Sequence, residues 1–204
     1  MKLDLWFDFA CPYCYVGHKL LLEGIKNSGK AIEINYRAFQ LEPDNDNRDT
    51  IFLEKVKQRE NLTDEQLNEK IDRIMKFSQE NGLQINPMSI VDVNTRTAHK
   101  ILKFTPEDKK EIVFDKIMSA YFVEGKDISD LEMLKDILGK SGVNFDGISK
   151  YNVSEEPVEE LRIDRLDAEK IWFEKIPYAK LENGKVLEGV YTKELVAEFL
   201  ADAE

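Results

Sequence analysis

The sequence predicts an α/β fold with a large helical insertion, and three observations lead to this prediction. The chain begins with an apolar run, a helical pattern and an alternating run, which is the order of a strand–helix–strand unit. Residues 45–156 are charged and helical in pattern, and strand character returns only near the end, before a closing helix. We therefore expect one α/β domain formed by residues 1–44 and 174–204, with a flanking helix at 157–173. Residues 45–156 are expected to form an inserted helical subdomain.

The first unit is predicted from the start of the chain. Residues 3–9 run apolar and favour a strand, and Asn27-Ser28-Gly29 ends the helix that follows. Residues 31–39 alternate apolar and polar side chains, which indicates a second strand. Two strands joined through one helix form a parallel pair with a right-handed crossover. The apolar positions that recur at helical spacing between the strands are Val16, Leu20, Leu21 and Ile25.

Capping signals divide the inserted segment into helices. Each signal is followed by an apolar stripe at helical spacing, which we interpret as core rather than as a ligand site. Two of the signals are capping boxes, in which a hydroxyl residue precedes a glutamine or glutamate by three positions. The signals are Thr63 with Gln66, Asn94, Pro106, and Ser129 with Glu132.

A hairpin and a helix close the predicted domain. Residues 176–182 and 185–189 favour two strands, and Asn183-Gly184 between them is the signal of a two-residue type I′ turn. A terminal helix is expected from Thr192 to about Asp202.

Length and charge limit the classes of function. The 204 residues are 42% hydrophobic, which suits a folded globule. A net charge of −11 argues against binding to nucleic acid or to an anionic membrane surface, because phosphate groups would repel it. No uncharged run approaches the roughly 18–20 residues of a membrane span. The start of the chain leads directly into a strand, so we expect no signal peptide and a cytosolic protein, in which a cycling disulfide is more typical than a structural one.

The chemistry is expected at Cys11-Pro12-Tyr13-Cys14, which contains both cysteines of the chain. Two intervening residues let both sulfurs sit on one helical turn, so a disulfide between them can close and reopen with little rearrangement. Cys11 would lie at the N-terminus of the following helix, where free N–H groups and the helix dipole stabilise a thiolate. Pro12 suits the first helical position. Cys14, one turn deeper, would act as the resolving thiol.

Two other interpretations of the cysteines are weaker. A pair of buried structural thiols would not need this strand-to-helix junction. A zinc site would need about four ligands, and only His18 and His99 join the two sulfurs, without the spacing of a zinc motif. We therefore expect no metal.

The order of these elements is that of a thioredoxin fold with a helical insertion, and the chain resembles the DsbA superfamily of thiol–disulfide oxidoreductases. Within it, the chain is most similar to the cytosolic FrnE-like branch, which includes proteins related to 2-hydroxychromene-2-carboxylate isomerases. The matching stretches are DFACPYCYVG at 8–17, YRAFQLEP at 36–43, NTRTAH at 94–99, SAYFVEGKDI at 119–128 and IPY at 176–178.

The resemblance implies roles for particular residues. Cys11 would be the exposed nucleophile and Cys14 the resolving thiol, while Ile176 and Pro177 would form a cis peptide that faces the disulfide. The helix start at Asn94 and the side chain of His99 would face the active-site cleft. Without the resemblance, Pro177 would be interpreted as a proline that begins a strand, and His99 as a helix-surface histidine.

The chain departs from the family pattern in two places. Tyr178 follows the proline, and Phe173-Glu174-Lys175 replace the usual small residues before it, which leaves the substrate range open. The dipeptide Pro12-Tyr13 is shared with glutaredoxins, whereas strongly oxidising relatives often carry a histidine there.

The leading hypothesis is a thiol–disulfide oxidoreductase that acts on protein thiols or on low-molecular-weight thiols such as glutathione, without a cofactor. One alternative is a glutathione-dependent isomerase or transferase of the same superfamily, although those relatives carry a serine where Cys11 stands. Another is a redox-responsive adaptor without enzymatic activity, in which acidic helix faces such as Asp64-Glu65 bind a basic partner.

Overall fold

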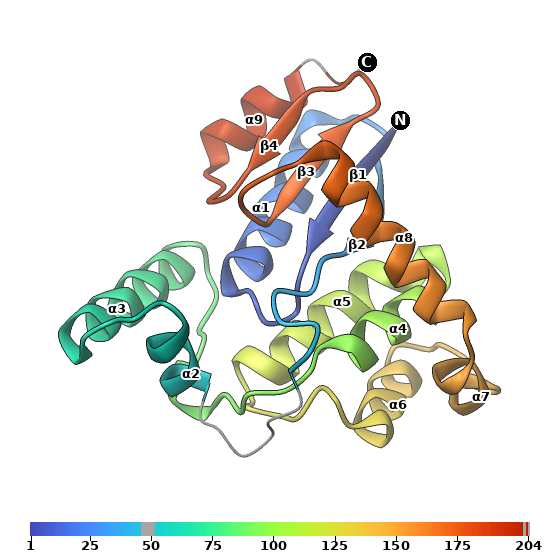
Figure 1. Cartoon of the computed structure of the whole chain (residues 1–204). Helices are drawn as coiled ribbons and strands as arrows, with labels where there is room; N and C mark the ends of the chain where they lie inside the picture. Colours follow the sequence, from blue (N-terminus) through green and yellow to red (C-terminus); the bar gives the residue numbers. More distant parts are fainter. Residues whose placement is uncertain (46–51, 202, 204) are drawn as a thin grey trace. The chain divides into compact units, whose positions relative to one another are not determined.

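The structure is a computed structural model that describes residues 1–45, 52–201 and 203. The chain forms two compact units, shown together in Figure 1. The first unit consists of Met1–Leu41 and Val158–Glu204, and the second of Glu42–Pro157. The polypeptide therefore leaves the first unit once and returns to it once.

The first unit is built on a sheet with the strand order β2-β1-β3-β4 in the described residues. β1 pairs in parallel with β2, as the strand–helix–strand pattern predicted, and antiparallel with β3, which in turn pairs antiparallel with β4. This mixed sheet is the one expected of a thioredoxin fold. The strands are β1 (Lys2–Phe7), β2 (Glu33–Ala38), β3 (Tyr178–Leu181) and β4 (Val186–Glu188).

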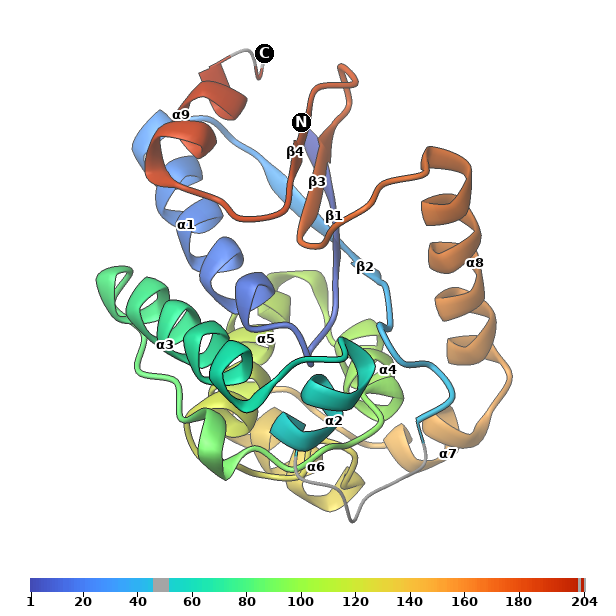
Figure 2. The same cartoon turned by 60° about the vertical axis from the view of Figure 1, so that its left-hand side comes forward.

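Helices cover both faces of this sheet. Helices α1 (Pro12–Ser28) and α9 (Lys193–Ala201) contact one another on one face, and α8 (Glu156–Ile171) covers the other (Figure 2). Alternation along the strands explains the division, because successive side chains point to opposite faces. Tyr36 reaches α1, where its hydroxyl lies 2.8 Å from Nε2 of His18. Trp6 faces α8 and donates its indole N–H to the carbonyl of Asp164 at 3.1 Å.

Arg37 fastens α8 to the sheet. Its guanidinium donates to Asp164 at 2.8 Å and to Asp167 at 3.1 Å, and its Nε lies 3.3 Å from Asp4. The other oxygen of Asp164 accepts the backbone N–H of Ala38 at 2.8 Å. Asp164 is only 1% exposed, so these partners replace the water that the carboxylate has lost.

The second unit is helical in its described residues. α5 provides much of its core, with Val113, Phe114, Ile117, Met118 and Tyr121 fully buried. This confirms that the apolar stripe of α5 is core, whereas the stripe of α3 is only partly so, with Ile74 buried and Leu67, Ile71 and Phe77 half-buried. The helices are α2 (Phe52–Arg59), α3 (Asp64–Glu80), α4 (Arg96–Phe104), α5 (Glu107–Phe122), α6 (Leu131–Lys140) and α7 (Ile148–Val153), with a 3-10 turn at Pro87–Ser89.

The predicted caps are confirmed in part. Thr63 and Gln66 form the expected capping box at α3. The second capping box is wrong, because Asp130 rather than Ser129 caps α6 by accepting the N–H of Glu132 at 2.9 Å. The hydroxyl of Ser129 instead donates to Asp127 at 2.6 Å. Ser129 and Asp130 are both residue types that cap helices, and in the structure the carboxylate of Asp130 is the cap.

The predicted hairpin forms, but its turn is not of type I′. A type I′ turn needs a positive φ at both central residues. Gly184 has φ 88°, whereas Asn183 has no positive φ. The N–H of Gly184 donates to the carbonyl of Leu181 at 2.9 Å, and Leu181 pairs with Lys185. The loop is therefore a three-residue turn that ends in a left-handed glycine.

The last predicted helix is present as α9, and its expected end at Asp202 lies outside the described residues. Among the residues that the structure describes, no helix has the length and apolar character needed to cross a membrane.

Candidate functional site

The two cysteines lie where β1 leads into α1. Cys11 caps the helix: its N–H donates to the carbonyl of Asp8 at 3.1 Å, and its own carbonyl accepts the N–H of Cys14 at 3.0 Å. Pro12 is the first helical residue, as predicted, because its missing N–H costs nothing at that position. Both cysteines are free thiols. Both sulfurs therefore sit on the first turn of one helix.

Cys11 is more accessible than Cys14, but it is not exposed. The exposed fraction is 6% for Cys11 and 1% for Cys14. This corrects the expectation of an exposed nucleophile. The physical reason includes the loop before β3, whose Ile176 carbonyl lies 3.9 Å from the Cys11 sulfur.

Cys14 is held as a neutral thiol. Burial raises the pKa of its thiol well above the usual value, and the hydrogen bond and charge of the adjacent Cys11 sulfur raise it further. A neutral thiol is a poor nucleophile, so Cys14 becomes reactive only when a proton is removed from it. The role of Cys14 as the resolving thiol stays a prediction.

The segment beside the thiols contains the expected cis peptide between Ile176 and Pro177. The backbone of this segment is bonded to the residue after β4, since the carbonyl of Pro177 accepts the N–H of Gly189 at 2.9 Å. Before it, the ring of Phe173 stacks on Tyr178 with a centroid distance of 4.4 Å. The segment is thus ordered by contacts on both sides of the proline.

Tyr191 is a residue of this site that the sequence analysis missed. Its ring is fully buried, and its hydroxyl donates to the carbonyl of Leu187 at 3.1 Å. Burial raises the pKa of the phenol well above its usual value, and the nearby Cys14 sulfur adds to that shift. No motif marks Tyr191, because its neighbourhood depends on residues far away in the chain.

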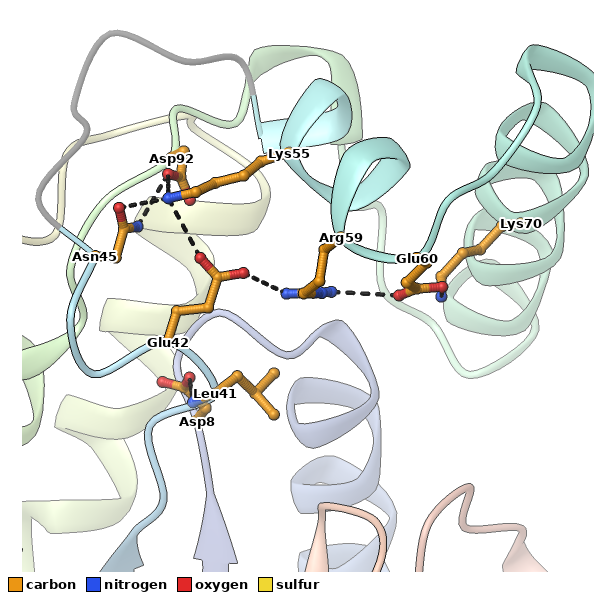
Figure 3. Close-up of polar contacts among 9 residues, drawn as sticks. All are labelled: Asp8, Leu41, Glu42, Asn45, Lys55, Arg59, Glu60, Lys70 and Asp92. Atoms are coloured by element: carbon orange, nitrogen blue, oxygen red, sulfur yellow. Dashed lines mark hydrogen bonds and ion pairs between the residues drawn. The ribbon is translucent and has the colours of Figure 1, made fainter.

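Asp8 is a second missed residue. It is 1% exposed, and its carboxylate accepts the N–H of Leu41 at 2.7 Å (Figure 3). Its carbonyl accepts the N–H of Cys11. Asp8 therefore ties the loop that carries the first cysteine to the end of the unit's N-terminal segment.

In the second unit, an ion-pair network surrounds the segment that begins at Glu42. Lys55 donates to Asp92 at 2.6 Å and to Asn45 at 2.5 Å, and it lies 3.3 Å from Glu42. The other oxygen of Glu42 accepts from Arg59 at 2.6 Å, as Figure 3 shows. Asp92 is 5% exposed, so this network is partly shielded from solvent. It fixes residues 42–45 to α2 and does not involve the thiols.

Asn94 and His99 belong to the second unit. The amide of Asn94 donates to the carbonyls of Pro43 at 3.1 Å and Asn45 at 2.8 Å, while its oxygen accepts the N–H of Arg96. His99 is 2% exposed, so the interpretation as a helix-surface histidine is wrong. The role of both residues at the cleft stays a prediction.

Metal ligation was another interpretation of the cysteines. Among the described residues, no group of three or more His, Cys, Asp or Glu side chains is placed to hold a metal ion. The ring of His18 contacts Tyr36 at 2.8 Å, and burial lowers its pKa to about 3. His18 is therefore a neutral core residue near neutral pH.

Comparison with known proteins supports this description of the fold. The family model for the DSBA-like thioredoxin domain matches residues 2–192. No curated protein sequence matches the chain.

Solved structures with a similar fold include two oxidoreductases and an isomerase. A probable DsbA oxidoreductase from Streptomyces coelicolor has 20% identity and a TM-score of 0.88, over 100% of this chain and 89% of that one. The cytosolic disulfide reductase DsbM from Pseudomonas aeruginosa has 15% identity and a TM-score of 0.66, over 98% and 97%. A 2-hydroxychromene-2-carboxylate isomerase has 18% identity and a TM-score of 0.66, over 93% and 89%. At these identities the likeness concerns the fold.

Proposed function

This chain belongs to the family of DSBA-like thioredoxin domains, and on that basis we propose that it is a thiol–disulfide oxidoreductase with Cys11 and Cys14 as its redox pair. The observation that carries the proposal is the placement of two free thiols on the first turn of α1, the less buried one at the helix N-terminus. The positive end of a helix dipole, which lies at this terminus, stabilises a thiolate relative to a thiol.

The first step is attack of the Cys11 thiolate on a substrate disulfide. A bond forms between the Cys11 sulfur and one substrate sulfur, and the substrate S–S bond breaks. The other substrate sulfur leaves as a thiolate and takes up a proton. The product is a mixed disulfide between Cys11 and the substrate.

The second step uses Cys14. Its thiol loses a proton and attacks the Cys11 sulfur, which releases the second substrate thiolate and closes the Cys11–Cys14 disulfide. Two electrons have then moved from the cysteine pair to the substrate. The raised pKa of Cys14 delays this step until a proton acceptor, such as the leaving thiolate, is at hand. Run in reverse, the same steps oxidise a substrate dithiol.

The substrates we propose are protein disulfides or low-molecular-weight thiols, with glutathione as the reductant of the pair. The fold of this chain is similar to that of DsbM, a structure of which was solved with GSH. The electrons reside in the sulfurs, so the reaction needs no metal or organic cofactor. We place the reaction in the cytosol, where a cycling disulfide can be reduced again.

A redox-buffer titration tests the proposal. The protein is equilibrated at different ratios of reduced to oxidised glutathione, alkylated, and analysed by mass. We expect one transition between dithiol and disulfide at a potential near the cytosolic poise. A pair that never closes at any ratio would contradict the mechanism.

A second candidate is a glutathione-dependent isomerase, favoured by the fold similarity to 2-hydroxychromene-2-carboxylate isomerase. In this reaction glutathione binds without cycling the cysteine pair. The double variant Cys11→Ser with Cys14→Ser separates the two candidates. If glutathione stabilises that variant against heat in a saturable way, the isomerase is favoured. If glutathione does not stabilise the variant, the oxidoreductase is favoured.

A further inference from the structure

Gly17 lies inside α1, where a glycine destabilises a helix relative to an alanine. The surroundings explain why no larger residue stands there. A Cβ at this position would lie 2.8 Å from Cγ of Pro177 and 3.2 Å from Cδ2 of Tyr191. Both distances are shorter than ordinary carbon–carbon contacts. The missing side chain therefore lets the proline ring rest directly on the helix, one turn beyond Cys14.

Glu188 holds the same segment at residues before the proline. One oxygen of its carboxylate accepts the backbone N–H groups of Glu174 at 2.7 Å and Lys175 at 2.6 Å. Its neighbour Gly189 donates to the carbonyl of Pro177 at 2.9 Å. The end of β4 therefore binds the segment at two points, before and after Ile176.

The contacts made by Gly17 and Glu188 lie on either side of the residue that approaches the Cys11 sulfur. Ile176 lies between the residues bound by Glu188 and the proline that rests on Gly17, and its carbonyl is 3.9 Å from the sulfur of Cys11. A shift of the segment on either side would change this distance. The carbonyl is a fixed dipole next to the atom that carries charge during exchange, so its position affects the reactivity of the thiolate.

We propose that Gly17 and Glu188 are positioning residues that hold segment 174–177 against Cys11, Gly17 by its missing side chain and Glu188 by its bonds to two backbone N–H groups. The inference rests on the proposed thiol–disulfide exchange and adds two residues that set its geometry. Neither residue touches the reacting sulfurs. Each acts through the segment.

The first test compares Gly17→Ala with Gly24→Ala. Gly24 is in the same helix, and a Cβ there would overlap Val196 and approach Leu200 of α9. Both variants thus crowd α1, but only Gly17→Ala displaces the segment at the thiols. The readouts are the rate of Cys11 alkylation by iodoacetamide, the dithiol–disulfide equilibrium with glutathione, and KM and kcat for a disulfide substrate.

For Gly17→Ala we expect a change of about tenfold or more in the alkylation rate of Cys11 and in KM, since a misplacement of 1 Å can cost about a hundredfold. For Gly24→Ala we expect lower thermal stability with wild-type alkylation and exchange. Equal effects of the two variants on the thiol readouts would overturn the role of Gly17.

The second test uses Glu188→Ala, Glu188→Gln and the matched control Glu182→Ala. Glu182 stands in the same hairpin and accepts the N–H of Lys2 at 2.8 Å, so it also binds backbone, but away from the thiols. We expect Glu188→Ala to change the alkylation rate and KM in the same direction as Gly17→Ala. Glu188→Gln keeps an acceptor oxygen, so its alkylation rate and KM should stay at the wild-type values. Wild-type thiol reactivity in Glu188→Ala, or the same change in Glu182→Ala, would overturn its role.

The two proposals fail in distinguishable ways. A wild-type protein that exchanges no disulfides contradicts the proposed function, while the alkylation rates still test the positioning. If Gly17→Ala does not fold, the three glutamate variants decide, because they remove or keep a hydrogen bond without crowding the core.

Discussion

A glycine allows close packing near each end of α1, but the segments that pack there differ. At the N-terminal end, Gly17 lets the Pro177 segment approach the helix beside the cysteines. At the C-terminal end, Gly24 lets α9 approach, next to a groove of about 380 Å³. Close packing at one end thus orders the segment beside the two thiols, whereas at the other it joins two helices. The comparison shows that the role of a glycine within a helix depends on which segment packs against it.

The ends also differ in charge. The first turn of α1, all of it described, carries no acidic side chain, although a carboxylate there would stabilise the helix dipole. The last turn carries Lys26 and ends in a left-handed Gly29, an ordinary stabilising arrangement. Four substitutions along the helix test this contrast.

The largest effect is expected at the N-terminus. Cys11→Ser should abolish disulfide exchange, because a serine hydroxyl is not ionised near neutral pH and cannot form the mixed disulfide. The measurement is turnover of a small disulfide substrate, with Glu23→Gln as the folded control. Turnover in Cys11→Ser close to that of the wild type would contradict the assignment of the nucleophile.

Cys14→Ser should leave the first step intact and block the second. We expect a mixed disulfide to accumulate on Cys11, visible by mass as one substrate or glutathione adduct per chain. In the wild type the same adduct should be resolved by Cys14. A variant that turns over without any adduct would show that Cys14 is not the resolving thiol.

His18, in the middle of the helix, should affect stability rather than chemistry. Its pKa is about 3 in the folded protein and about 6.5 in the unfolded chain, so the unfolded chain binds the proton first. Stability from this group is present above pH 6.5 and is lost as the pH falls toward 3. Between pH 7 and pH 5 the loss amounts to about 2 kcal/mol.

Urea unfolding at both pH values checks this prediction against His18→Gln, which does not titrate in this range. The wild type should lose about 2 kcal/mol more free energy of unfolding than the variant does. Identical pH dependence of the two proteins would mean that His18 does not stay neutral.

The smallest effect is expected at the C-terminal end. Lys193 of α9 donates to Glu23 at 3.0 Å, and both side chains are largely exposed, so solvent screens the pair. Glu23→Gln should lower the free energy of unfolding by about 0.5 kcal/mol or less. Exchange activity should stay at the wild-type level. A loss of activity would show that the two ends of the helix are not independent.

The cysteines and the proline could be found from the sequence, whereas their surroundings could not. Cys11 and Cys14 stand in a motif whose spacing has a chemical meaning, and the family resemblance pointed to Pro177. Asp8 carries no such mark, because its partner Leu41 is 33 positions away. Burial of Cys11 was missed for the same reason: Ile176, which lies against it, is 165 positions away.

Local interactions explain what the sequence by itself determined: β1 and β2 as strands, the helix that begins at Pro12 and ends at Gly29, and two thiols on one turn. The parallel pairing of the two strands follows from the single helix that joins them. Periodicity, caps and motif spacing involve neighbouring residues, so they are legible in the chain. Only the tertiary structure decided the turn of the hairpin, the burial of Cys11 and the fit of Pro177 onto Gly17. The burial of Cys11 and the fit of Pro177 depend on which distant segments come within a few ångströms, and hydrophobic burial, which acts at any sequence separation, sets that. The turn is decided by hydrogen bonds among residues 181–185 once the two strands pair.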